Sequence, residues 1–440
     1  MATFDNYLAN DEKRKHLKNR LAQYITNKDN NSDYEIEKII PKLFGKEKDI
    51  VSAIYSTFIK ETNIPVTLPI FTTFSFISAF LLKNNITYSI DGYMDGCLND
   101  LWIVNLAPSG SSKTYSLSRI INSIPEIDES KIIEPNFSHC SGAMAFCQEL
   151  KEKNNGFYFA DECAQVLKQI ESINSPMHEV KKYLLLTYDH SKIQRKNKKE
   201  NIEIEKPALT LYWINTIQSF IDSVSTDSLS DGFSQRFLYV YTEKDMNRHF
   251  KEFPLYSNIS VEKEISSEFK KFFSNTFHKN YVFNKDMVEM FKIAFKEIVE
   301  TRFNNNFDES FYRRVMFKTF TYAVIYHLIL NKNTVEIDEE DMEYALRVSL
   351  IHLYSIQRIL SIKTETEFNG IDKTINNSMN VYKKAKEKNQ PVTSRILQQQ
   401  VWGLKKADDA KFMKEFIDEK LSDFDNFQDD FSFLNDDFKS

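Results

Sequence analysis

Short apolar runs and helix-like patterns alternate in the middle of this 440-residue chain. Between about Thr87 and Thr242, runs of strand length recur with stretches of helical periodicity between them. Such alternation is typical of α/β proteins built on a parallel sheet. The runs that we expect to form this sheet are LWIVNLA (101–107), GFYFAD (156–161), ALTLYWIN (208–215) and FLYVYT (237–242).

Helical patterns flank this α/β core on both sides. Short helices are expected before it, and TYSIDGYMDG (87–96) has the pattern of a hairpin at its start. Beyond about Lys263 the pattern predicts no further strands, because long amphipathic stretches such as DMVEMFKIAFKEIVETRF take over. The expected regions are a helical region 1–88, a P-loop core 89–258, a helical lid 259–365, and a helical piece with an acidic tail 366–440.

One uncharged stretch, residues 63–82, has about the length of a membrane span. It contains Pro65, Pro69 and five hydroxyl residues, and no Trp or Tyr stands at either end. We therefore predict a buried helix that starts near Pro69, where a proline suits the first turn, and no membrane partner.

Composition narrows the class of protein further. The formal net charge is -6, which argues against a uniformly basic coat for nucleic acid. The four cysteines form no CxxC pair, so neither a zinc site nor a disulfide framework is indicated. No secretory signal pattern opens the chain, and a reducing, cytoplasmic setting is expected.

The segment APSGSSKT, residues 107–114, has the features of a phosphate-binding loop, or Walker A motif. It follows an apolar strand and precedes a predicted helix, whose first backbone N–H groups would face a phosphate. Lys113 would reach the terminal phosphates and Thr114 would ligate magnesium. Ala107 and Ser112 stand where the pattern GxxxxGK[ST] has glycines, so a serine-rich turn is the alternative. The predicted nucleotide contacts are Ser109, Gly110, Ser111, Ser112, Lys113 and Thr114.

An acidic pair follows the strand GFYFA, about fifty residues after the loop. In an open parallel sheet, ligands bind at the carboxyl ends of the strands, so Asp161 and Glu162 would lie beside the phosphates. Asp161 would hold Mg²⁺ through water, and Glu162 would polarise the attacking water. The alternative is a helix N-cap with an acidic first turn.

Two polar residues further along could complete a catalytic site. Asn215 ends the strand ALTLYWIN, where it could sense the γ-phosphate, although an ordinary cap or turn is the alternative. Arg236 directly precedes FLYVYT. An arginine of this kind can enter the site of a neighbouring subunit as an arginine finger, which would require an oligomer, whereas a plain surface arginine would not.

A basic cluster lies between the acidic pair and Asn215. The alternating NIEIE after it predicts the return strand of a hairpin with a basic tip. Such a tip could grip the backbone of single-stranded DNA by charge, and a solvated loop is the alternative. The candidate nucleic-acid contacts are Lys192, Arg195, Lys196, Lys198 and Lys199.

Taken together, these motifs resemble a P-loop domain family of otherwise unknown function that occurs in phage, prophage and plasmid primase-helicase proteins. The resemblance covers about residues 65–360 and rests on the proline-led helix and on four further segments, APSGSSKT, SGAMAFCQEL with FYFADE, YDHSKIQRKNKKENIEIEKPALTLYWINTIQ, and DGFSQRF. It implies an AAA+-like or RecA-like motor related to superfamily 3 replicative helicases, with a helical lid.

By position, the resemblance implies that Lys113 and Thr114 bind ATP, that Asp161 and Glu162 act on Mg²⁺ and water, that Asn215 is the sensor and that Arg236 is the finger. The chain departs from the family at the two glycines and at the lid helix TFTYAVIYHLIL. Family members tend to have an arginine at the start of that helix, and here Arg313 and Arg314, two turns earlier, are the candidates to replace it.

The C-terminal segment DFDNFQDDFSFLNDDFKS interleaves phenylalanines with aspartates and is too charged to pack as a core. We expect it to mimic single-stranded nucleic acid or to dock a replication partner, and a solubilising terminus is the alternative.

The function that these features favour is an ATP-dependent DNA translocase or helicase, a hexameric ring that serves replication of a phage, plasmid or other mobile element. A nucleotide-gated regulatory or antiphage-defence ATPase with little unwinding is a second possibility, and a structural adaptor with a vestigial loop is a third.

Overall fold

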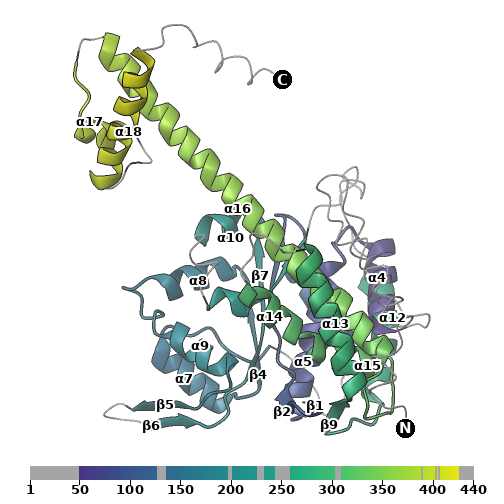
Figure 1. The fold of residues 1–440 in the computed structure, drawn as a ribbon. Coiled ribbons are helices and arrows are strands. Elements are labelled where there is room, and N and C mark those ends of the chain that lie inside the picture. Colours follow the sequence, from purple (N-terminus) through teal and green to yellow (C-terminus); the bar gives the residue numbers. More distant parts are fainter. Residues whose placement is uncertain are drawn as a thin grey trace. The chain divides into compact units, whose positions relative to one another are not determined.

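The computed structural model describes residues 49–125, 135–196, 201–224, 232–242, 258–302, 309–387, 390–401, 404 and 407–425. Some predicted features lie outside these ranges, among them Lys198, Lys199 and most of the acidic tail. The chain forms two compact units, residues 1–360 and 361–440, and the first contains every strand of the described residues. Figure 1 shows the elements of both.

A four-stranded parallel sheet forms the centre of the first unit. Its strands are β3 (Trp102–Ala107), β4 (Gly156–Ala160), β7 (Leu209–Thr216) and β8 (Leu238–Tyr241), in the order β4-β7-β3-β8. All the pairings between neighbours are parallel. The predicted α/β core is confirmed, and because the strands are parallel, their carboxyl ends meet at one edge.

Helix α5 (Thr67–Lys83) covers one face of this sheet, and all of its residues except Lys83 are buried. Its hydroxyl groups are satisfied there: Thr72 donates to the Tyr212 hydroxyl of β7 at 3.0 Å, and Ser78 donates to the Asn99 carbonyl at 2.6 Å. The predicted buried helix is confirmed, with Pro69 in its first turn. Among the described helices, none combines the length and apolarity that crossing a membrane demands.

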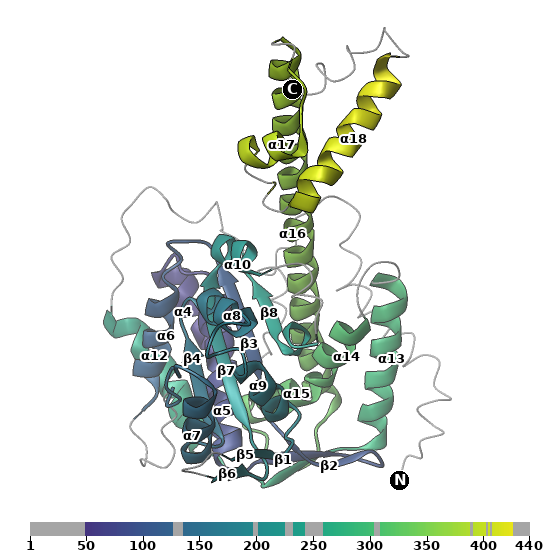
Figure 2. The same cartoon turned by 90° about the vertical axis from the view of Figure 1, so that its left-hand side faces the viewer.

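Helices from the connections between the strands cover the other face of the sheet, except α6 (Lys113–Ser123), which packs beside α5. Side chains of β7 alternate between the two faces, so that Trp213 packs away from α5, against Tyr158 and Phe237. The connecting helices on this face are α7 (Ala143–Glu152), α8 (Cys163–Glu171), α9 (Val180–Tyr188) and α10 (Ile217–Ser223). Figure 2 shows α8 and α10 at one end of the sheet, and the hairpin of β5 (Ile193–Lys196) and β6 (Asn201–Ile204) at the other.

A second, smaller sheet has the order β2-β1-β9. The predicted hairpin is confirmed, because β1 (Thr87–Ile90) pairs antiparallel with β2 (Met94–Leu98). The prediction that strands stop after Lys263 is wrong, since β9 (Asn280–Phe283) pairs in parallel with β1. A four-residue strand between long helices has too short a pattern to stand out, and its partner lies almost two hundred residues earlier in the chain.

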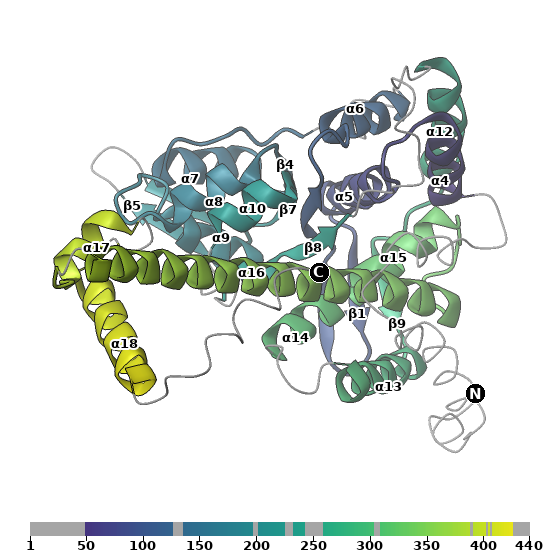
Figure 3. The same cartoon turned by 90° about the horizontal axis from the view of Figure 1, so that it is seen from above.

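The remaining helices of the first unit pack around these sheets. Aromatic side chains dominate one contact, where Phe80 of α5 meets Phe272 and Phe273. In Figure 3, α12 lies beside α4 and α6, in agreement with their contacts. The elements are α4 (Ile50–Glu61), α6 (Lys113–Ser123), α12 (Asn258–Phe273), α13 (Lys285–Arg302), α14 (Glu309–Phe317), α15 (Thr319–Ile329) and the start of α16 (Glu339–Glu387).

The second unit contains the end of α16 with α17 (Ser394–Gln400) and α18 (Ala407–Asp425). Leu397, Val401, Leu404 and Ala410 form its buried cluster. The Tyr382 hydroxyl on α16 donates to the Asp418 carboxylate on α18 at 2.7 Å, which adds a polar contact beside this core.

A buried ion pair joins Lys318, the residue before α15, to Asp100, which lies just before the central strand β3. The Lys318 amine donates to the Asp100 carbonyl at 2.9 Å and lies 3.2 Å from its carboxylate, while His190 lies 3.4 Å away on the same carboxylate. Burial alone would raise the pKa of Asp100, but the charges of Lys318 and His190 outweigh it and hold the pKa at about 2.

Asp100→Asn is expected to destabilise the protein by about 3–5 kcal/mol at neutral pH, because it leaves the buried Lys318 ammonium without its counter-ion. The folded-state pKa of Asp100 is depressed, so its contribution to stability is present above the unfolded value of about 4 and is lost as the pH falls toward 2. Urea unfolding at several pH values measures both effects. The exposed Asp95 nearby is the matched control, and an Asp100→Asn midpoint equal to that of Asp95→Asn would contradict the expectation.

Candidate functional site

The segment 108–112 joins the carboxyl end of β3 to the first residue of α6, Lys113. Gly110 has φ +78° and Ser112 has φ 53°, both in the left-handed region. Ser112 therefore adopts a backbone conformation that glycine accepts without strain, at a cost of about 1–2 kcal/mol. Ser112, which replaces the glycine of the motif, thus retains a left-handed backbone conformation. The N-terminus of α6 lies at the end of the sheet where all four parallel strands end.

The Lys113 side chain is half-buried above this turn. Its amine lies 3.5 Å from the Pro108 carbonyl. Burial lowers the pKa of the amine below its usual value, and the charges of Asp161 and Glu162 oppose part of that shift. The lysine and the acidic pair are thus electrostatic neighbours, as the order of the two motifs predicted.

Asp161 directly follows β4 and meets the segment after β3. The Thr114 hydroxyl donates to one Asp161 carboxylate oxygen at 2.7 Å, and the backbone N–H of Glu162 donates to the other at 2.9 Å. Two hard oxygen ligands, a hydroxyl and a carboxylate, therefore lie side by side across forty-seven residues of sequence.

Glu162 occupies the N-cap position of α8 with φ 54°, a left-handed conformation that is uncommon for a glutamate. Its carboxylate makes no capping bond and instead accepts a hydrogen bond from the Gln165 amide at 2.7 Å. The alternative of an ordinary acidic N-cap finds no support in this geometry. Strained backbone conformations of this kind cluster at functional sites.

A groove of about 460 Å³ opens beside the acidic pair on the side of β4. Carboxylates, carboxamides, an imidazole and a phenol line it, so it is polar on several sides. The lining residues include His139, Tyr158, Asp161, Glu162, Gln165 and Gln169.

Asn215 lies near the end of β7, in register with Leu106 of β3, and is 1 % exposed. Its carbonyl oxygen accepts a hydrogen bond from the Ala164 N–H at 3.2 Å, and its amide donates to the Thr216 carbonyl at 2.9 Å. Asn215 thus fixes the first turn of α8, which carries Glu162. In this structure it acts on the acidic pair through that turn.

Arg236 lies at the other end of the sheet, where the parallel strands begin. It ends the 3₁₀ turn Ser234–Arg236, just before β8 begins. One terminal nitrogen donates to both Asp189 carboxylate oxygens, at 3.1 and 2.9 Å. A strand as long as the six-residue β3 spans about 20 Å, so Arg236 is far from the phosphate loop of its own chain.

The basic cluster forms the predicted hairpin, in which β5 (Ile193–Lys196) pairs antiparallel with β6 (Asn201–Ile204). Two of its cations already have acidic partners. Lys192 pairs with Glu203 and Glu205, and Arg195 pairs with Glu179 at 2.8 Å. Lys196 is exposed, while Lys198 and Lys199 lie outside the described residues.

The two lid arginines have partners on α14 and on the turn before β8. Arg313 pairs with Glu309 one turn earlier on α14, and Arg314 donates to the Gln235 side chain at 2.6 Å, beside Arg236. Whether either takes the place of the arginine that the family resemblance implies stays a prediction.

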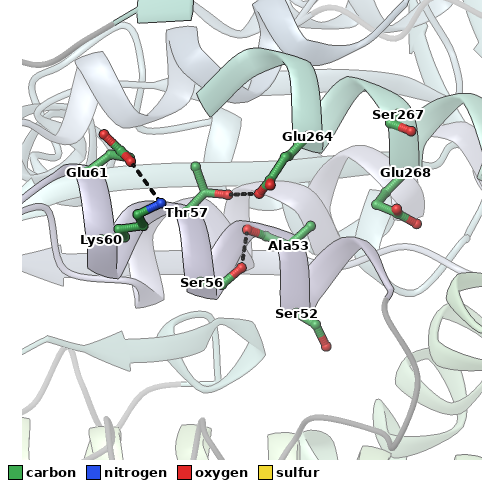
Figure 4. A pocket seen from close by; sticks show the side chains of 9 residues that line it. All are labelled: Ser52, Ala53, Ser56, Thr57, Lys60, Glu61, Glu264, Ser267 and Glu268. Carbon is green, nitrogen blue, oxygen red and sulfur yellow. Dashed lines mark hydrogen bonds and ion pairs between the residues drawn. The ribbon is translucent and has the colours of Figure 1, made fainter. Parts of the chain in front are cut away.

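A second groove, of about 600 Å³, lies between α4 and α12 and had no signal in the sequence. Thr57 donates to Glu264 across it at 3.2 Å, and Lys60 pairs with Glu61 at its rim, as Figure 4 shows. In the described part of the chain, no cluster of three or more His, Cys, Asp or Glu side chains is arranged to hold a metal.

The sequence matches no protein-family model, and no curated protein matches it.

Proposed function

We propose that this protein hydrolyses ATP at the junction of the phosphate loop and the acidic pair, and that an oligomer uses this energy to move on DNA. The observation that carries the first half is the 2.7 Å hydrogen bond from Thr114 to Asp161, with Lys113 alongside. A hydroxyl after a loop lysine and a carboxylate after a neighbouring strand are the groups that a magnesium nucleotide requires.

The residues present fit magnesium. Mg²⁺ prefers oxygen ligands and is usually held by one or two carboxylates together with substrate phosphates. Thr114 and Asp161 would supply the protein ligands. Bound there, Mg²⁺ would neutralise charge on the β- and γ-phosphates.

Each remaining side chain has a role in this proposal. Backbone N–H groups at the start of α6 and the Lys113 amine bind the phosphates. Glu162 accepts a proton from the attacking water, whose oxygen bonds to the γ-phosphorus as ADP leaves. Asn215 holds the turn that positions Glu162, through its bond to Ala164.

Arg236 supports an oligomer. Because it lies at the opposite edge of the sheet from the phosphate loop, it cannot reach the γ-phosphate of its own subunit. At the surface between two subunits it would neutralise charge that develops in the partner's site, as arginine fingers do. A closed ring, such as a hexamer, gives every site one such arginine.

The β5–β6 hairpin is the proposed contact to single-stranded DNA. Lys196 is exposed on it, and Arg195, the residue before it, is held against Tyr183 and Glu179. The DNA phosphates would compete with Glu203 and Glu205 for Lys192, and with Glu179 for Arg195. We therefore expect weak, salt-sensitive binding without sequence preference. We place the activity in the cytoplasm, since the four cysteines form no disulfide.

The proposal is tested by measuring the separation of the strands of a forked DNA, with fluorescence as the readout, in the presence and absence of ATP. ATP-dependent unwinding, or ATP-dependent displacement of a protein block from single-stranded DNA, is the expected result. An oligomer that turns over ATP but does neither would exclude the motor.

A nucleotide-gated regulatory or defence ATPase is the second candidate. The strained Ser112 at a glycine position and the acidic partners of Lys192 and Arg195 favour it, because both weaken the parts that a motor needs. Slow turnover that single-stranded DNA leaves unchanged would identify this function.

A further inference from the structure

Asp189 holds Arg236 in a defined orientation. Both of its carboxylate oxygens accept from the same terminal nitrogen, and the other terminal nitrogen donates to the Gly232 carbonyl. The Arg236 side chain is 13 % exposed, whereas Asp189 is 47 % exposed. The guanidinium is therefore fixed on two sides, and its counter-ion lies nearer to solvent.

Tyr188 provides a rigid base for this pair. The Arg236 guanidinium lies over its ring at 5.3 Å, and the buried Lys318 amine lies over the same ring at 5.1 Å. The Tyr188 ring also packs at a steep angle against Trp102 of the central strand, with the ring centroids 5.1 Å apart. These contacts tie the arginine to the sheet and to the start of α15.

Asp189 also stands at the base of the β5–β6 hairpin. It follows the last residue of α9. The next residue, His190, is held at both ring nitrogens: Nε2 lies 3.4 Å from the Asp100 carboxylate, and Nδ1 donates to the Pro207 carbonyl at 3.1 Å. Three residues separate Asp189 from the first residue of β5. The hairpin and the arginine thus share one anchored attachment point.

We propose that Asp189 is the positioning residue for Arg236 and that it fixes this arginine to the base of the hairpin. This inference rests on the proposed function, in which Arg236 completes the site of a neighbouring copy. Asp189 itself touches no substrate. Its role is to present the guanidinium to the neighbour in one orientation.

The test uses full-length Asp189→Asn, Arg236→Ala and Lys113→Ala subunits, assayed for ATP turnover alone and as mixtures. Alone, Arg236→Ala is expected to lose about 10³-fold in turnover, and Asp189→Asn about 10- to 100-fold, because the arginine is present but misoriented. Nucleotide binding by Asp189→Asn is expected to stay unchanged, so the loss falls on kcat.

Mixing separates a role in the neighbour's site from a local structural role. A Lys113→Ala subunit has an intact Asp189–Arg236 pair but no working phosphate site, so it should restore the sites of Asp189→Asn subunits in mixed oligomers. Turnover by the mixture should exceed the sum of its parts. Glu149→Gln, which removes a carboxylate of α7 that pairs with Lys153 one turn later, is the control and should keep normal turnover.

The outcomes distinguish this inference from the proposed function. Restoration of both Arg236→Ala and Asp189→Asn by Lys113→Ala supports both. Restoration of Arg236→Ala alone, or wild-type turnover by Asp189→Asn, overturns the role of Asp189 and leaves the oligomeric site standing. If Arg236→Ala has normal turnover, the proposed arginine finger itself is wrong.

Discussion

Lys113→Ala is expected to lower ATP turnover by about 10²-fold or more and to abolish detectable binding of ATP. The Lys113 amine is half-buried beside two carboxylates, with the Pro108 carbonyl as its hydrogen-bond partner. A triphosphate would replace that carbonyl as its partner. Without the amine, the phosphates would face Asp161 and Glu162 with no cation from the loop, and repulsion would oppose binding.

Isothermal titration calorimetry with a slowly hydrolysed ATP analogue and Mg²⁺ measures this loss directly. Lys168→Ala, which removes an exposed lysine from α8, is the matched control and should bind as the wild type does. Equal affinity of Lys113→Ala and Lys168→Ala would show that the loop does not hold the phosphates.

Glu162→Gln is expected to lower turnover by about 10²- to 10⁴-fold while nucleotide binding is retained. The substitution keeps the size and the left-handed backbone position of the side chain but removes the base that would accept a proton from water. The hydrogen bond from Gln165 can persist, because the carboxamide oxygen also accepts. Binding without turnover is the signature of a lost general base.

Single-turnover hydrolysis and calorimetry on the same preparation separate the two quantities. Glu171→Gln at the end of α8 is the control for loss of one carboxylate from this helix. If Glu162→Gln hydrolyses ATP at the rate of Glu171→Gln, another group activates the water and the role given to Glu162 is wrong.

The parallel sheet could be predicted from sequence because each of its four strands is a largely apolar run of strand length. Burial on both faces removes polar residues from such strands, so their pattern is strong. A turn followed by a helix at residues 108–114 could also be predicted, although Ser112 stands where the motif has a glycine. Ser112 has a left-handed backbone conformation, which is the conformation that a glycine would adopt most readily at this position.

Partners far apart in sequence could not be predicted. Asp189 binds Arg236 across forty-seven residues, and Lys318 binds Asp100 across more than two hundred. The residues of each pair are too far apart in the sequence for the periodicity of a helix or a strand to indicate that they meet. The same holds for Asn215, whose contact to Ala164 depends on how β7 and α8 pack.

Charge in the hairpin illustrates a related limit. The sequence shows a cluster of cations, which indicates a surface for nucleic acid. The structure pairs Lys192 and Arg195 with carboxylates of β6, the segment after it and the start of α9. The number of lysines and arginines in the hairpin therefore overstates the positive charge that a nucleic acid would meet, because neighbouring segments supply acidic partners.

The most direct test of the whole account is an experimental structure with a non-hydrolysable ATP analogue and Mg²⁺. We predict terminal phosphates against the Lys113 amine and the N-terminus of α6, with the metal between the phosphates and the oxygens of Thr114 and Asp161. A saturating analogue found elsewhere on the protein, with this edge of the sheet unchanged, would contradict it.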